Sequence, residues 1–302
     1  MLPFYTLDVF TDQPFAGNPL AVVLEADGLS TAQMQTIARE FNLSETIFVR
    51  KPVDPAHTAE VRIFFPTAEI PFAGHPTIGC ALLLAELAAL TAFAGEDVSH
   101  IVLEEQAGLV PVSLSTEGGI RQATFAAPVI PYPRPCEIDA ALLSRAVDLA
   151  PSDIGFASHT CGVFAGGPAF LYVPVQDLQA LARARPIEPF WSDLMEAAGV
   201  DSAYLYTPGK GADFRARMFS PTAGIPEDPA TGSASAILAA SFLAAGALGE
   251  GTTSFALRQG VEMGRPSRIG LAVDVLAGKI TAVRVTGTAV RISEGRISVP
   301  AP

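Results

Sequence analysis

One six-residue pattern occurs twice in this chain, and it constrains the fold more than any other feature. Residues 66–71 are PTAEIP and residues 221–226 are PTAGIP, so five of the six positions are identical. The copies begin at positions 66 and 221, 155 residues apart, which is about half of the 302-residue chain. Repetition at this spacing indicates an internal duplication, in which each copy belongs to one of two domains of similar structure.

A polar residue, a proline and several small residues follow each copy and lead into a long apolar run. GHPTIGCA (74–81) aligns with EDPATGSA (227–234) after a two-residue slip, so that His75 matches Asp228 and Cys80 matches Ser233. Proline and small residues before an apolar run are typical of a helix start, where four backbone N–H groups have no partner within the helix. A purely structural reading, in which both segments only begin core helices, stays open.

The remaining pattern predicts an α+β fold made of two pseudo-symmetric α/β domains, each a mostly antiparallel sheet around a central apolar helix. In the first half, strands are predicted at 5–10, 20–24, 45–50 and 59–65, a helix at 30–41, and hairpins over 101–125. The Pro-rich segment 127–135 is predicted to be a linker. In the second half, helices are predicted at 190–198 and 233–248, with strands at 203–206 and 215–219 and several more beyond residue 254.

Charge and composition exclude several classes of function. The net charge of −12 and the pI near 4.7 argue against a nucleic-acid or membrane partner. No secretory signal, membrane-spanning run or nucleotide-binding glycine motif is present in the sequence. The three cysteines lack C-x-x-C spacing, so neither a disulfide framework nor a metal site is expected. The protein is expected to be cytoplasmic.

Glu45 breaks the symmetry between the two halves. When SETIFV (44–49) is aligned with SAYLYT (202–207), Ala203 stands opposite Glu45. A carboxylate beside two converging helix starts could abstract a proton next to a carbonyl or carboxylate, with Gly74 and Gly232 allowing close backbone approach. The structural alternatives are an exposed strand-end Glu45, a helix-capping Asp228 and a structural His75, and these patterns alone do not exclude them.

Five motifs occur in a fixed order along nearly the whole chain. They are DVFTDQPFAGNPLAVV (8–23), SET (44–46), PFAGHPTIG (71–79), GIPEDPATGSA (224–234) and QGVEMGRPS (259–267). Together they resemble the phenazine-biosynthesis PhzF-like family, which is related in fold to diaminopimelate epimerase and proline racemase. The resemblance implies domains at 1–127 and 128–287 with a cleft between them, and makes the strand at about 288–302 a candidate to return to the first domain. It also implies a homodimer and no cofactor.

The same resemblance implies roles for individual residues. Glu45, His75, Asp228 and Ser233 match the family's catalytic residues, while Asn18, Gly74, Thr231 and Gly232 are the expected substrate-binding residues. The racemase and epimerase relatives use two cysteines, but the matching segments here have no Cys at the catalytic point, and Cys80 is expected in the core. The expected activity is cofactor-independent proton transfer within a small carboxylate substrate, as in trans-2,3-dihydro-3-hydroxyanthranilate isomerase. An amino-acid epimerase or racemase, or a non-catalytic small-molecule binding protein of the same fold, are the alternatives.

Overall fold

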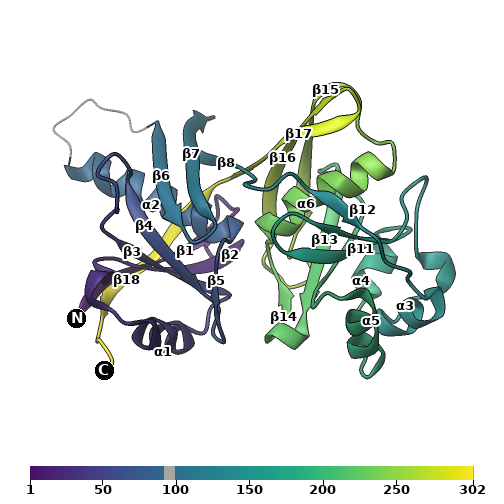
Figure 1. The fold of residues 1–302 in the computed structure, drawn as a ribbon, viewed down its shortest axis with the longest axis horizontal. Helices are drawn as coiled ribbons and strands as arrows, with labels where there is room; N and C mark the ends of the chain where they lie inside the picture. The colour runs from purple at the N-terminus through teal and green to yellow at the C-terminus, as the bar shows by residue number, and fades with distance from the viewer. Residues whose placement is uncertain (92–98, 302) are drawn as a thin grey trace. The chain divides into compact units, whose positions relative to one another are not determined.

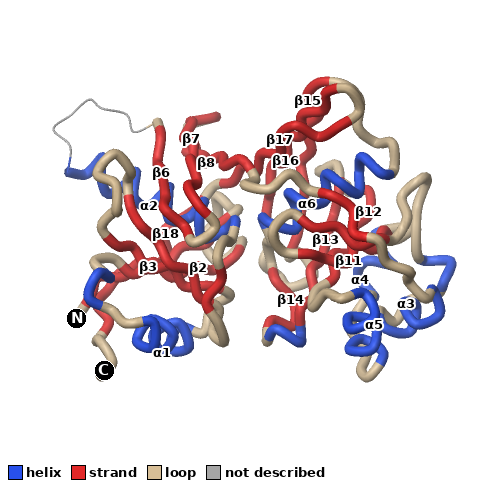
Figure 2. The backbone as a smooth tube through the Cα atoms, in the orientation of Figure 1, coloured by secondary structure: helices blue, strands red, loops and turns tan. Residues whose placement is uncertain are grey.

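A computed structural model describes residues 1–91 and 99–301, and these form two compact units. Unit 1 comprises residues 1–128 and 286–302, and unit 2 comprises residues 129–285. Both units are mixed α/β structures in which strands predominate over helices (Figure 2). None of the described helices is long and apolar enough to cross a membrane.

Unit 1 is built on a sheet in which strands from opposite ends of the chain pair with each other. The strand β1 (Leu2–Val9) pairs antiparallel with both β2 (Asn18–Val23) and β18 (Ala289–Ile297). Next, β2 pairs parallel with β3 (Glu45–Arg50), which pairs antiparallel with β4 (Ala59–Phe64). The strand β4 then pairs with the short β5 (Glu69–Ile70) and parallel with β6 (His100–Glu105). Finally, β7 (Gly108–Glu117) and β8 (Ile120–Ala126) continue from β6 as antiparallel neighbours.

The described part of unit 1 contains two α-helices. The helix α1 (Thr31–Phe41) begins at a capping box, in which the Ser30 side chain and the Gln33 side chain each bond the other's backbone N–H. The second helix, α2 (Gly74–Thr91), packs against strands on several sides, including β1, β2, β3 and β8 (Figure 1). A Cβ at Gly79 would lie 2.6 Å from Leu20 Cδ2 and 2.8 Å from Val9 Cγ2, so glycine allows this helix to lie close to β1 and β2.

Unit 2 contains the same succession of strand pairings. The strand β10 (Gly162–Ala165) pairs antiparallel with β11 (Ala169–Pro174), which pairs parallel with β12 (Ala203–Pro208). The strand β13 (Phe214–Ser220) pairs antiparallel with β12 and β14 (Ile225–Asp228), and parallel with β15 (Gly251–Gln259). The strand β16 (Ser267–Leu276) is antiparallel to β15, and β17 (Lys279–Gly287) follows it in the chain.

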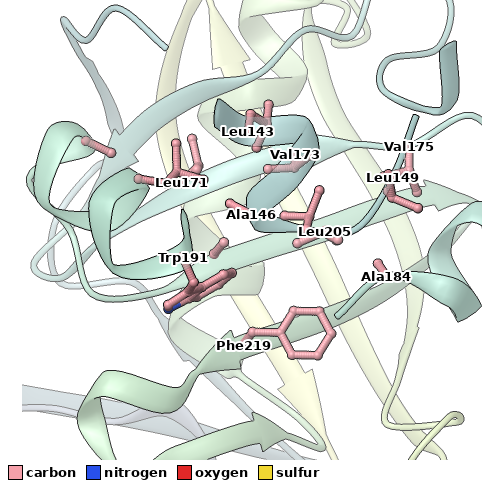
Figure 3. Packing of buried hydrophobic residues seen from close by; sticks show 14 of the residues in the cluster. Leu143, Ala146, Leu149, Leu171, Val173, Val175, Ala184, Trp191, Leu205 and Phe219 are labelled. Atoms are coloured by element: carbon pink, nitrogen blue, oxygen red, sulfur yellow. The ribbon is translucent and has the colours of Figure 1, made fainter. Parts of the chain in front are cut away.

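The helices of unit 2 are α3 (Ala140–Ala146), α4 (Leu178–Arg183), α5 (Phe190–Ala198) and α6 (Gly232–Ala244). A hydrophobic cluster in this unit joins residues of α3 and α5 to the strands β11, β12 and β13 (Figure 3). Within this cluster the fully buried Trp191 ring meets the Phe219 ring edge-on, with centroids 6.3 Å apart. Sequence patterning predicted α5 and β3 with their observed bounds.

Two predictions about local structure were wrong. The predicted linker 127–135 contains a strand, β9 (Tyr132–Arg134), which pairs antiparallel with β10. The apolar helix predicted to reach residue 248 ends at Ala244, because Gly246 takes a left-handed conformation (φ 69°) and its N–H bonds the Leu243 carbonyl. The short helices α3 and α4 were not predicted.

Candidate active site

Three predicted site residues of unit 1 lie together and are buried. Asn18 is the first residue of β2, Glu45 is the first residue of β3, and His75 lies in the first turn of α2. The His75 Nδ1 atom is 3.2 Å from Glu45 Oε2 and 3.3 Å from Asn18 Nδ2. The prediction that Glu45 could be an ordinary exposed strand end is wrong, since only 7% of the residue is exposed.

The parallel pairing of β2 and β3 explains why Asn18 and Glu45 meet. Leu20 is the register partner of Glu45, so the starts of both strands lie at the same edge of the sheet. Gly74, the first residue of α2, is also buried beside this edge. The start of a helix, with its free N–H groups, therefore adjoins a buried carboxylate and a buried imidazole.

The imidazole of His75 is neutral at ordinary pH. Burial lowers its pKa to about 3, although a hydrogen bond with the Pro19 backbone carbonyl partly opposes this shift. Its contact with Glu45 is therefore a contact between a carboxyl group and a neutral ring rather than an ion pair. Among the described residues, His75 Nε2 has no hydrogen-bond partner. A buried ring nitrogen without a partner is a group that a bound polar ligand could satisfy.

A second buried carboxyl group holds the first turn of α2. Thr77 Oγ1 lies 2.7 Å from Glu105 Oε1 and 2.8 Å from the Ala73 carbonyl oxygen. Burial raises the pKa of Glu105 to about 8, while the contact with Thr77 opposes the shift. The Thr77 hydroxyl has a single hydrogen and donates it toward these two oxygen acceptors.

The predicted residues of unit 2 lie around the start of α6. Asp228 ends β14 and is buried, and its Oδ2 accepts a 2.6 Å hydrogen bond from Thr231 Oγ1. Asp228 is not the N-cap residue of α6, because Thr231 occupies that position. Gly232 begins the helix and Ser233, which is half-buried, follows it.

Gln259 fastens this segment to the end of β15. Its Oε1 accepts a bond from the Thr231 backbone N–H at 3.1 Å, and its Nε2 donates to the Asp228 carbonyl at 2.8 Å and to Thr231 Oγ1 at 3.0 Å. Gly260 follows with φ 70°, and a Cβ there would lie 2.6 Å from the Pro229 carbonyl oxygen. The QG pair thus shapes the loop that carries Asp228.

Sequence reasoning missed the roles of Glu105 and Gln259. Each is the last residue of its strand, β6 or β15, and each bonds a threonine 28 residues earlier in the chain. Cys80, by contrast, is a core residue as predicted, since it is 0% exposed. Burial and the nearby Glu105 raise the pKa of its thiol well above the usual range, which makes it a poor base for proton abstraction.

The chain resembles known proteins along almost its full length. The model of the PhzC-PhzF family, described as phenazine biosynthesis-like protein, matches residues 7–295. An uncharacterized isomerase of Mesorhizobium japonicum is 42% identical over 299 residues, which cover 97% of each chain. The trans-2,3-dihydro-3-hydroxyanthranilate isomerase of Pseudomonas aeruginosa is 34% identical over 297 residues, covering 97% of this chain and 98% of the relative.

Solved structures agree with the sequence relatives. A PhzF-family phenazine biosynthesis protein of Bacillus anthracis superposes with a TM-score of 0.86 at 26% identity, covering 99% of each chain. A probable proline racemase of Agrobacterium radiobacter has a TM-score of 0.64 at 13% identity, covering 99% of this chain and 94% of the other, and it shows a shared fold. The predicted family resemblance is confirmed: the chain belongs to the PhzC-PhzF family of phenazine biosynthesis-like proteins, whose named relatives here are isomerases.

Proposed function

We propose that the protein is a cofactor-independent isomerase that moves a proton between two carbons of a small carboxylate substrate, with Glu45 as the acid/base residue. The observation that carries the proposal is the buried Glu45 carboxyl group, 3.2 Å from a neutral His75 at the start of α2. The names of the relatives in Pseudomonas support a cyclohexadiene carboxylate of the dihydrohydroxyanthranilate type as the substrate class.

The proposed reaction needs one carboxylate in two roles. Glu45 removes a proton from an sp³ carbon that is made acidic by conjugation with the substrate's carboxylate or enamine. The protonated Glu45 then returns the proton to another carbon of the same substrate, so that the enzyme ends in its starting state. Exclusion of water from a buried carboxylate strengthens it as a base, which suits this reaction near neutral pH.

The other predicted residues are proposed to bind and orient. A neutral His75 can form a hydrogen bond with a substrate amino or hydroxyl group without adding charge. The Asn18 amide contacts the imidazole and helps to fix its orientation. Asp228 is proposed to hold a polar substituent, with Thr231 and Gln259 fixing its position. In each unit the backbone N–H groups at the start of the long helix are proposed to bind a carboxylate group, near Gly74 in unit 1 and near Gly232 and Ser233 in unit 2.

We also propose that the two units arose by internal duplication, each around its long apolar helix. The matching order of parallel and antiparallel pairings, β2–β3–β4–β6 and β11–β12–β13–β15, supports this proposal. The homodimer and the cytoplasmic location expected from sequence remain predictions. Sedimentation of the purified protein tests the first.

A thiol-based racemase is the less favoured alternative. Its mechanism requires two reactive cysteines, and Cys80 is buried with a raised pKa. If the Glu45→Gln variant still caused an amino-acid substrate to lose its optical rotation, that result would favour the racemase alternative.

Proton NMR in deuterated water tests the proposal. The wild type and Glu45→Gln are each incubated with dihydrohydroxyanthranilate and a panel of related carboxylates, and Glu40→Gln, at an exposed position of α1, serves as the matched control. We expect deuterium uptake and product formation with the wild type and the control, and loss of both in Glu45→Gln while calorimetry still detects binding. Turnover by Glu45→Gln at the wild-type rate would remove Glu45 from the mechanism.

A further inference from the structure

Two of the three cysteines lie in one place in unit 2, far in sequence from the predicted site motifs. Cys136 and Cys161 are both free, half-buried and packed against the hydrophobic cluster that contains Trp191. Both also line a cavity of about 340 Å³, whose other walls include Leu143 and Ile154. An apolar cavity with two thiols in its wall is not needed for the proposed isomerisation.

The two cysteines lie just beyond the end of a strand ladder whose register, if continued, would place them opposite each other. In the antiparallel pair of β9 and β10, Ala165 faces Tyr132 and Val163 faces Arg134. Continuing this register by two residues brings Cys161 opposite Cys136. Directly opposed residues of antiparallel strands have Cβ atoms about 4.5–5.5 Å apart. A disulfide needs about 3.5–4.5 Å, so a small movement at the end of the ladder suffices.

We propose that Cys136 and Cys161 are a modification site that closes into an intramolecular disulfide when the protein meets a small-molecule disulfide such as oxidised glutathione. In the first step the Cys136 thiolate attacks one sulfur of the oxidant, forms a mixed disulfide and releases one glutathione thiolate. In the second step the Cys161 thiolate attacks the Cys136 sulfur and releases the second glutathione thiolate. The protein loses two electrons and two protons, and the oxidant becomes two thiols.

The environment of each thiol sets the order and the pH dependence of these steps. Cys136 Sγ contacts carbonyl oxygens at the surface, those of Glu137 and Ala197, at 3.7 and 3.9 Å. Burial raises the pKa of the Cys161 thiol to about 12, so the closing step accelerates as the pH rises through the alkaline range. In a reducing cytoplasm the pair would remain a dithiol.

The bond would close a loop that carries α3 and borders the cavity. Residues between the two cysteines include Leu143, Ala146 and Leu149, which are buried in the unit 2 cluster. A cross-link at the base of this loop restricts the unfolded chain and so raises the melting temperature.

Thiol counting and peptide mapping test the proposal on the full-length protein. After incubation with oxidised glutathione at pH 8.5 and denaturation, we expect titratable thiols to fall from three to one, since two of the three cysteines would be joined. The intact mass should fall by two hydrogen atoms, and digestion should yield one peptide pair linked through Cys136 and Cys161. The oxidised protein should also melt at a higher temperature than the reduced protein.

Three single variants make the result specific. Cys136→Ser and Cys161→Ser should each abolish the linked peptide and the change in melting temperature, whereas Cys80→Ala should retain both. Mixed disulfides at both positions without ring closure, or no loss of thiols at any glutathione ratio, would overturn the proposal. A linked peptide that contains Cys80 would overturn it as well.

Discussion

The two units fasten the start of their long helix in the same manner but with different chemistry. In unit 1 the last residue of β6, Glu105, bonds Thr77 in the first turn of α2. In unit 2 the last residue of β15, Gln259, bonds Thr231 at the start of α6. A buried amide does the same structural task as a buried carboxyl group, but only the carboxyl group can ionise. The attachment of α2 in unit 1 therefore depends on the protonation of a buried carboxyl group, whereas the attachment of α6 in unit 2 does not.

A second difference concerns the first residue of the strand beside each helix. β3 begins with Glu45, whereas β12 begins with Ala203, and the register partners of the two residues are Leu20 and Leu171. The carboxylate is therefore found at this strand start in unit 1 but not in unit 2. Unit 2 instead has its buried carboxylate at Asp228, three residues before the cap of α6.

The largest expected effect comes from comparing the two carboxylates. Glu45→Gln should lower turnover roughly 10²–10⁴-fold, because removal of a general acid/base has effects of this size. Asp228→Asn keeps the shape and one acceptor oxygen, so we expect a smaller loss, on the order of tenfold. Steady-state rates and deuterium uptake for both variants measure the difference. Equal losses would contradict a single-carboxylate mechanism.

Glu105→Gln should remove the pH dependence that Glu105 gives to the stability of unit 1. The pKa of Glu105 is raised from 4.5 to about 8, so the folded protein binds a proton that the unfolded chain releases between these values. The contribution of Glu105 to the free energy of unfolding should therefore be largest below pH 4.5. Between pH 4.5 and pH 8, the free energy of unfolding of the wild type should fall relative to that of the variant by roughly 1.4 kcal/mol per pH unit.

Urea denaturation at several pH values between 5 and 8 measures this slope. Gln259→Glu is the reciprocal variant and should acquire a slope of the same sign, since it places a carboxyl group in the corresponding buried position. Parallel stability curves for the wild type and Glu105→Gln would show that Glu105 is ionised in the folded protein.

Thr231→Val should destabilise unit 2 by about 1.5–3 kcal/mol, because it leaves the buried Asp228 carboxylate without the hydroxyl that now donates to it. Thr77→Val in unit 1 should have a smaller effect, about 1 kcal/mol, because its partner Glu105 has a pKa raised to about 8 and is therefore uncharged at pH 6. Thermal unfolding at pH 6 compares the two variants. A larger loss for Thr77→Val would reverse this ranking.

Gly79→Ala should destabilise unit 1 by about 1–2 kcal/mol. The added methyl group would collide with Leu20 and Val9, although alanine favours the helix more than glycine does. Gly249→Ala is the control, because a Cβ at Gly249 meets nothing within 4 Å. If Gly79→Ala were as stable as that control, α2 could move away from β1 and β2 without loss.

Local pattern was sufficient to predict some elements and insufficient for others. The bounds of β3 and α5 follow from compact apolar patterns, and the start of α1 follows from Ser30. α3 and α4 have seven and six residues and depend on the capping carboxylates of Asp139 and Asp177. Helices this short have little periodicity of their own, and packing against the rest of unit 2 stabilises them.

The candidate site also contains some residues that were predicted from the sequence and some that were not. Family motifs identified Glu45, His75 and Asn18, and the parallel pairing of β2 with β3 brings them together. Glu105 and Gln259 each end a strand of otherwise ordinary composition, and their partners lie 28 residues away in the chain. A single sequence contains no pattern that links such residues, because the contact exists only after the strand and helix have packed.

The pairing of β1 with β18 has a consequence for synthesis on the ribosome. Leu2 pairs with Ile297, so β1 is made long before β18, the strand that covers this edge of it. The segment 129–285 is continuous and emerges complete before then. Unit 2 can thus fold first, while the half that contains Glu45 completes its sheet only after β18 has been made.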